Sequence, residues 1–289
     1  MKRKVFLKKS LVMGLAAVVA PKLISPKGLS QTQGLNTKNK HKMLQKIGIS
    51  KIDRGFITIL YPGTTVLENE TGIGSIGRID HANFSGDSFI KMHPHVNDEI
   101  LSYFRSGKSE HKDSEGFVEY IGKERLMLMK AGKLFYHEER MIDEGEPLEG
   151  LQIFIRPGKK DLPPEVHFLE LEELHSENKW RLIASPTEET KFQFSSQTWI
   201  YDTKLLQNNK IALPKLAREN LTCLLYVFKG NAKIQSETNA DISLVAKESV
   251  VIKNQEITIT ANQDTEFVLF VTDEQTEIFK GGMYSGDQT

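Results

Sequence analysis

The sequence contains a single cysteine, Cys223, among 289 residues. One thiol can form neither a disulfide within the chain nor a cysteine-rich zinc site, which leaves histidine and carboxylate side chains as metal ligands. An excess of charge is missing too, because 38 Lys and Arg residues balance 38 Asp and Glu residues. A chain without net charge generates no global field that attracts nucleic acid or an anionic membrane. We therefore expect no nucleic-acid partner.

The start of the chain also lacks an apolar run of membrane-spanning length. The run that it has, Leu11–Ala20, is too short for an ordinary membrane-spanning helix. Five basic residues precede this run, and together they predict an export signal over residues 1–24. The segment Arg3–Lys8 resembles the twin-arginine export motif with Lys4 at the second arginine, which leaves the general secretory route open. We expect a periplasmic protein. Because Pro21 disfavours cleavage after Ala20, an N-terminal membrane anchor is the alternative.

The rest of the chain lacks helical periodicity. Residues 25–50 are rich in Ser, Gln, Asn, Lys and Gly and predict a linker. From residue 51 onward, short runs of β-branched and aromatic residues are bounded by Gly, Pro, Asn or Asp. This spacing is typical of an antiparallel barrel or sandwich and not of βαβ units. The sequence therefore predicts an all-β protein.

A stretch rich in proline, glycine and charge, Arg156–Pro164, divides this β-rich sequence and predicts domains over residues 51–160 and 161–289. Similar glycine turns, at Gly107 and Gly230, indicate a duplicated barrel. Histidine is absent after His175, so the second domain cannot rebuild a histidine metal site. We expect its barrel to be structural or to form a wall of the first.

Two short motifs carry the candidate chemistry, His93-Pro94-His95 and His137-Glu138-Glu139. Side chains two residues apart on a strand point the same way, so two such pairs can aim four ligands at one metal. Three imidazoles and one carboxylate suit divalent Fe, Mn, Ni, Cu or Zn better than Ca or Mg. For an isolated pair, solvent-facing strand histidines would be the simpler interpretation.

Four segments resemble the pirin family in order and spacing: Met92–Tyr103, Gly107–Gly116, Lys130–Glu139 and Leu151–Pro157. They contain His-Pro-His, Glu-His-x-Asp-Ser and Ala-Gly-x4-His-x-Glu in that order. The resemblance runs from about Gly77 to about Asp273 and implies a bicupin, that is, two cupin-type antiparallel β-barrels with the metal in the N-terminal one. Residues 51–160 would be that metal-binding cupin, and residues 161–289 a cupin without ligands.

The resemblance places the metal ligands at His93, His95, His137 and Glu139. It implies quercetin 2,3-dioxygenase activity, in which O2 and a flavonol, enol or catechol react at one metal, most commonly Fe(II). We expect Glu139 to serve also as the catalytic base that takes the substrate hydroxyl proton. The alternative function is a non-catalytic, iron-binding redox sensor that regulates a partner. Glu99 is a rival carboxylate by the broader cupin pattern and is expected near the ligands.

Several residues around the motifs differ from the family or play other roles. His111 in the Glu-His-x-Asp-Ser motif is expected to be structural, with Asp113 and Ser114 forming a turn. After His95, many pirins have Arg-Gly-Phe where this chain has Val96-Asn97-Asp98, and Leu134 stands at a usual glycine. These positions line or shape the mouth of the site in relatives. We therefore expect substrate identity to be the property most affected.

Overall fold

The computed structural model describes residues 42–63, 72–142, 144–237 and 239–287. The export signal predicted over 1–24 and most of the predicted linker lie outside these ranges. In the described ranges the regular elements are β-strands, which confirms the all-β prediction. None of these segments forms a helix with the length and apolar character that a membrane crossing needs.

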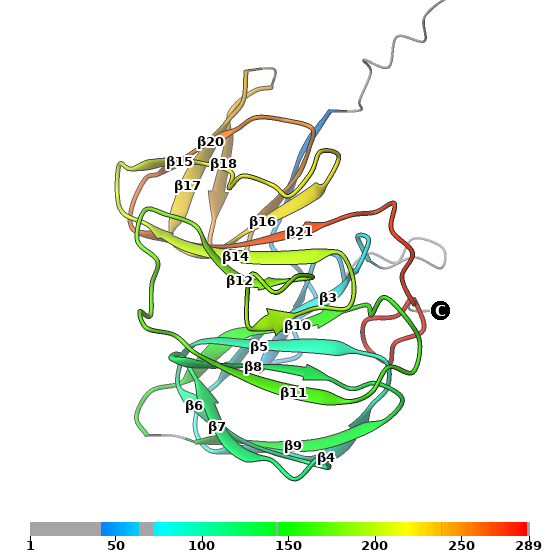
Figure 1. Cartoon of the computed structure of the whole chain (residues 1–289). Coiled ribbons are helices and arrows are strands. Elements are labelled where there is room, and N and C mark those ends of the chain that lie inside the picture. The colour runs from blue at the N-terminus through cyan, green and yellow to red at the C-terminus, as the bar shows by residue number, and fades with distance from the viewer. Residues whose placement is uncertain (1–41, 64–71, 143, 238, 288–289) are drawn as a thin grey trace, which may run out of the picture. The chain divides into compact units, whose positions relative to one another are not determined.

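The first barrel is built from two antiparallel sheets (lower part of Figure 1). The larger sheet has the order β11-β8-β5-β10-β3-β2 and the smaller one the order β4-β9-β6-β7. The larger sheet comprises β2 (Ile57–Leu60), β3 (Ile76–Phe84), β5 (Glu99–Ser106), β8 (Arg125–Lys130), β10 (Leu148–Ile155) and β11 (Glu165–Glu170). The smaller sheet comprises β4 (Ser88–His95), β6 (Lys108–Asp113), β7 (Val118–Gly122) and β9 (Phe135–Ile142). Apolar side chains such as Phe104, Met129 and Phe135 fill the space between them.

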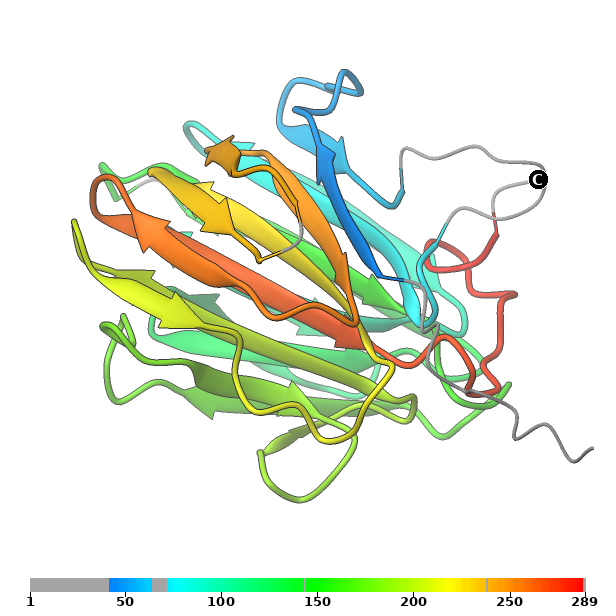
Figure 2. The ribbon, with the colours of Figure 1, turned by 90° about the horizontal axis from the view of Figure 1, so that it is seen from above.

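The second barrel repeats this plan with the sheets β1-β19-β16-β21-β14-β12-β13 and β15-β20-β17-β18 (Figures 1 and 2). The first of these sheets comprises β1 (Met43–Ile47), β12 (Arg181–Ser185), β13 (Phe192–Gln193), β14 (Thr198–Leu205), β16 (Thr222–Lys229), β19 (Ser249–Lys253) and β21 (Thr265–Thr272). The second comprises β15 (Lys210–Ala212), β17 (Asn231–Gln235), β18 (Ile242–Val245) and β20 (Thr258–Ala261). The Cys223 side chain is buried in this barrel.

The large sheets of the two barrels share one apolar core. Leu101 and Ile153 of the first barrel belong to the same buried cluster as Leu224 and Phe270 of the second. Burying a side chain of this size contributes about 1.5–3 kcal/mol each. The second barrel therefore supports the sheet that lies opposite the candidate metal site.

The chain crosses between the barrels at places that differ from the predicted domain limits. Met43–Ile47, predicted as linker, is strand β1, because its residues pair with the edge strand β19 and Met43 and Ile47 pack against the shared core. Glu165–Glu170, predicted in the C-terminal domain, is β11 and pairs with β8 of the first barrel. Its central side chains are half-buried, which suits an edge strand and does not indicate which barrel the strand joins.

Candidate metal centre

The candidate ligands lie on neighbouring strands of the smaller sheet of the first barrel. His93 on β4 is directly opposite His137 on β9, and Glu139 is opposite His111 on β6. Side chains of β9 alternate strictly, so that His137 and Glu139 are buried while Tyr136 is exposed. This alternation aims the functional groups of two strands into the barrel, as their sequence spacing predicts.

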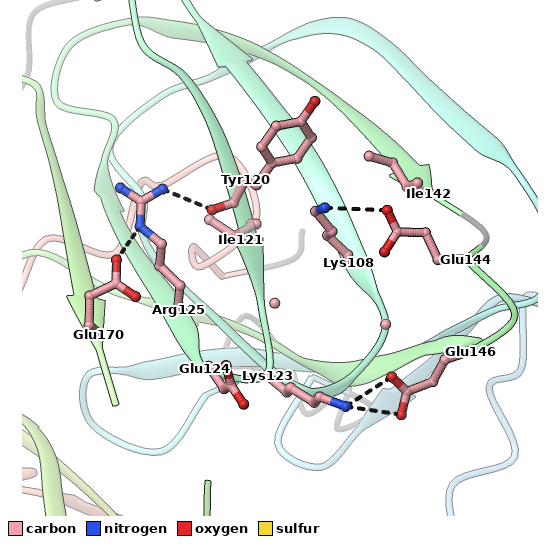
Figure 3. A pocket seen from close by; sticks show the side chains of 12 residues that line it. Lys108, Tyr120, Ile121, Lys123, Glu124, Arg125, Ile142, Glu144, Glu146 and Glu170 are labelled. Carbon is pink, nitrogen blue, oxygen red and sulfur yellow. Dashed lines mark hydrogen bonds and ion pairs between the residues drawn. The ribbon is translucent and has the colours of Figure 1, made fainter. Parts of the chain in front are cut away.

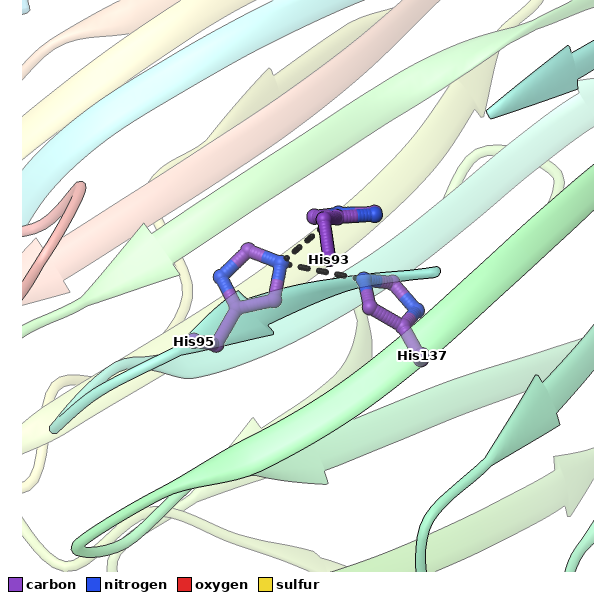
Figure 4. Close-up of side chains that lie close together, drawn as sticks. All are labelled: His93, His95 and His137. Atoms are coloured by element: carbon purple, nitrogen blue, oxygen red, sulfur yellow. Dashed lines mark hydrogen bonds between the residues drawn. The ribbon is translucent and has the colours of Figure 1, made fainter. Parts of the chain in front are cut away.

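Three imidazole nitrogens converge inside the barrel (Figure 4). The Nε2 atom of His95 is 3.2 Å from Nε2 of His93 and 3.0 Å from Nε2 of His137. Two nitrogens that each bind one ion at about 2.1 Å lie about 3.0 Å apart when their bonds meet at a right angle, and about 3.4 Å apart in a tetrahedron. The observed distances lie within the range that these two values span, so the three nitrogens are placed to bind one ion.

Hydrogen bonds behind the rings leave Nε2 free to bind a metal. The Nδ1–H of His93 donates to the Lys91 carbonyl over 2.9 Å. A carboxylate can only accept, so His111 donates its Nε2–H to Asp113 over 2.7 Å and keeps a lone pair on Nδ1. That lone pair accepts the Nδ1–H of His137 over 3.3 Å. The chain of bonds from Asp113 through His111 fixes the His137 tautomer in which Nε2 is bare.

Two buried polar atoms at the site have no hydrogen-bond partner, His95 Nδ1 and Glu139 Oε1. The acceptor facing His95 Nδ1 is the carboxylate of Asp98 at 3.5 Å, which is electrostatic contact and not a hydrogen bond. Unpaired buried polar atoms are rare in folded proteins and commonly mark a missing ion or ligand. His95 Nδ1 points away from the cluster, so the fit to a divalent transition metal rests on the three converging Nε2 atoms and on the unpaired Glu139 oxygen.

Burial tunes the protonation of these groups. It lowers the pKa of His137 well below its usual value, and the neighbouring imidazoles lower it further. Burial also lowers the pKa of His93. Both rings are thus held neutral, which is the form that binds metals. Burial raises the pKa of Glu139 to about 7, so that this carboxyl group can exchange a proton near neutral pH.

The structure brings some of the predicted residues closer together than others. His93, His95 and His137 form one group of candidate ligands, and His111, His137 and Glu139 form a second, each within 4.8 Å. Glu139 Oε1 is 3.9 Å from His137 Nδ1, on the side of His111. In the described part of the chain, the clusters of this kind are confined to β4, β6 and β9.

The remaining predicted residues have other surroundings. Both Glu99 oxygens accept the N–H of Ser195, so this carboxylate faces the second barrel and not the histidines. Asp113 makes the expected turn by accepting the N–H groups of Glu115 and Phe117 with its other oxygen. Its link to His137 through His111 was missed by sequence reasoning, although the His-x-Asp spacing places both on one strand face. No comparable spacing in the sequence indicated the contact of Asp98 with His95.

A cleft of about 440 Å³ lies at the far end of β6 and β7 (Figure 3). Six of its charged residues form ion pairs: Lys108 with Glu144, Lys123 with Glu146, and Arg125 with Glu170. None of the candidate ligands lines this cleft. We assign no chemistry to it.

Comparisons with known proteins relate this chain to one family. A model of the pirin family matches residues 60–155. Proteins named quercetin 2,3-dioxygenase from Escherichia coli O157:H7 and K12 are 27% identical over 179 residues, which is 62% of this chain and 74% of theirs. These matches confirm the resemblance to the pirin family, and the pirin structures described next confirm the bicupin fold inferred from the sequence.

Solved structures show the same fold at low identity. The crystal structure of the bacterial pirin YhhW from Escherichia coli in complex with nickel(II) has a TM-score of 0.66 and 22% identity, covering 80% of this chain and 99% of that one. A quercetin 2,3-dioxygenase from Acinetobacter baumannii has a TM-score of 0.63 and 23% identity, covering 80% and 85%. The family relation and the histidine cluster together indicate a divalent metal site.

Proposed function

We propose that this protein is an exported, metal-dependent dioxygenase that acts with O2 on a flavonol, enol or catechol of the quercetin kind. The observation that carries the proposal is the convergence of three Nε2 atoms, in which His95 Nε2 lies 3.2 Å from that of His93 and 3.0 Å from that of His137. An unpaired carboxylate oxygen of Glu139 lies 3.9 Å from Nδ1 of His137. Similarity to proteins named quercetin 2,3-dioxygenase supports the reaction class. His93, His95 and His137 would hold the metal, Fe(II) in this proposal, and Glu139 would complete the set.

The bound metal would supply a Lewis acid for the substrate hydroxyl oxygen and electron exchange with O2. The side chains would orient the substrate, exclude water from the site and supply a proton acceptor. Glu139 Oε1 is buried and has no hydrogen-bond partner, so it can accept the hydroxyl proton of a substrate held beside the histidines. Phe135 is fully buried, and the tilted Phe154 ring lies 6.3 Å from the His95 ring, centroid to centroid. These rings would keep water away from this side of the cluster.

Metal content and oxygen uptake of matched variants test these roles. His137→Ala should lose metal and uptake together. Glu139→Gln should retain a substantial fraction of the metal, because three imidazoles remain, but should lose at least 100-fold in uptake rate, because the proton acceptor is gone. The control Glu138→Gln changes the neighbouring carboxylate, which pairs with Lys112 outside the barrel, and should behave as wild type.

The outcomes separate the hypotheses. Oxygen uptake that survives in Glu139→Gln at the wild-type rate would refute its role as the base. Stoichiometric metal without oxygen uptake on quercetin or any simple catechol would contradict the enzyme and favour a metal-dependent regulatory protein. Absence of bound metal in the wild type would contradict both.

A further inference from the structure

The end of the chain returns from the second barrel to the candidate metal site of the first. After β21 the chain runs down beside the first barrel (red in Figure 1), and residues 282–287 lie against it. We refer to residues 282–287 as the C-terminal strap. The Met283 N–H donates to the Val96 carbonyl over 2.8 Å, which brings the strap to the residue that follows His95.

Asp98 holds the backbone of the strap. Its carboxylate is fully buried and accepts the N–H of Tyr284 over 3.1 Å and that of Ser285 over 2.8 Å. The same carboxylate is the group that faces His95 Nδ1. Bonds from backbone N–H groups to a charged carboxylate are stronger than neutral ones. One buried side chain therefore connects the strap to a candidate ligand.

Arg156 fixes the other side of the strap. This fully buried guanidinium donates to the Ser285 carbonyl over 2.8 Å and to the Asp287 carboxylate over 2.6 Å. It also donates to the Gly74 carbonyl. A planar group with several donors can bridge two segments in one orientation. The strap is thus tied to the barrel on both sides by buried charged groups.

Glycine allows this close approach. A Cβ atom at Gly77 on β3 would lie 2.1 Å from the Ser285 carbonyl oxygen, and one at Gly282 would lie 2.6 Å from the Asn97 carbonyl oxygen. Side chains at either position would displace the strap, since backbone atoms cannot yield as a flexible side chain can. The fit is therefore that of a packed interface and not of a loose chain end.

The strap carries an aromatic ring to the histidines. The Tyr284 ring lies 5.2 Å from the His95 ring and 5.4 Å from the Phe154 ring, centroid to centroid. The Arg78 guanidinium lies over it at 5.6 Å. His95 is 2% exposed, whereas Tyr284 is only half-buried. Tyr284 therefore packs against the buried His95 ring while its own side chain reaches the surface.

We propose that the C-terminal strap is a built-in wall of the metal site and that Tyr284 is a specificity-determining residue, which sets what reaches the His95 side of the cluster. The strap docks on Val96, Asn97 and Asp98, the segment where this sequence departs from the family pattern. It lies outside residues 60–155, which match the family model. The inference deepens the proposed function and rests on it for its consequence, namely substrate selection.

Chemical modification of metal-free protein tests the wall without any need for catalysis. Diethyl pyrocarbonate acylates accessible imidazoles, and mass spectrometry of peptides reports the rate at His95 relative to His167, whose side chain is 37% exposed. Tyr284→Ala should raise the His95 rate at least fivefold, whereas Tyr284→Phe, which keeps the ring, should stay within twofold of wild type. Met283→Ala is the matched control, because this neighbouring side chain is 44% exposed.

Gly77→Ala provides a second, independent displacement of the strap, acting from β3. It should raise the His95 rate as Tyr284→Ala does. Wild-type rates in both variants would overturn the proposal, even if the protein consumed oxygen. Conversely, raised rates in a protein that consumes no oxygen would support the wall and count only against the proposed function.

A second measurement concerns selection itself. In nickel-loaded protein, capture of the metal by the bulky chelator 4-(2-pyridylazo)resorcinol should be at least fivefold faster in Tyr284→Ala than in Met283→Ala. Equal capture rates would overturn the role of Tyr284 in access to the bound metal.

Discussion

Asp113 is connected to the candidate ligand His137 through the intervening side chain of His111, so we expect it to affect metal binding. Its Oδ2 accepts the Nε2–H of His111 at 2.7 Å, and His111 in turn accepts the Nδ1–H of His137 at 3.3 Å. In Asp113→Asn, an amide oxygen can replace only one carboxylate oxygen. The backbone N–H groups of Glu115 and Phe117 in the turn donate to that oxygen, over 2.9 and 3.1 Å. The amide NH2 is then left facing His111.

This substitution reverses the chain of hydrogen bonds. With a donor opposite its Nε2, His111 carries its proton on Nδ1, and His137 must move its own proton to Nε2. An Nε2–H cannot bind a metal. Because changes behind metal-bound histidines typically cost 10–100-fold in metal affinity, we expect a loss of about 1.4–2.7 kcal/mol in binding free energy.

Competition with a coloured chelator measures that affinity, and nitrogen-15 spectra of the imidazoles report the tautomer of His137. Glu110→Gln is the matched control, because Glu110 lies on β6 beside His111 and its side chain points to the opposite face. Wild-type affinity in Asp113→Asn, together with an Nδ1–H tautomer of His137, would refute the reasoning.

Three further predictions concern stability. Burial raises the pKa of Glu99 from 4.5 to about 7. The protonated group therefore stabilises the fold below pH 4.5, and this contribution, at most about 3 kcal/mol, is lost as the pH rises to 7. Glu99→Gln should flatten the dependence of the free energy of unfolding on pH in this range, measured by urea unfolding. Phe270→Ala should lower the free energy of unfolding by about 3–5 kcal/mol in the same assay, because the ring is fully buried between the barrels. Tyr103→Phe removes a buried 2.8 Å hydrogen bond to Asp202 and should cost about 1–3 kcal/mol, whereas an unchanged midpoint would mean that Arg181 alone satisfies Asp202.

Local patterns in the sequence predict the parts of the site that depend on strand alternation. The His93 and His95 pair and the His137 and Glu139 pair each point inward because side chains two apart share a face. The sequence does not predict how the two pairs are aligned across the sheet. In the structure, Glu139 lies opposite His111 and not beside His95. That offset depends on the register of β4 on β9, which shifts at an irregularity between Ile90 and His93.

Contacts between distant segments were not predictable from periodicity. Strand β1 has only five residues, and its place beside β19 depends on an edge that the other barrel strands create. The C-terminal strap has no regular structure, and its docking depends on Asp98 and Arg156, more than a hundred residues earlier in the sequence. Buried charged groups satisfied by backbone far away in sequence leave no periodic signal.

Incorporation of labelled oxygen tests the central claim most directly. Metal-loaded protein should consume one O2 per quercetin under oxygen-18 gas and place both labelled atoms in the cleaved product, and His137→Ala should do neither. Quercetin consumption that is equally fast in His137→Ala, or a product without label from O2, would contradict the assignment of this histidine cluster to a dioxygenase.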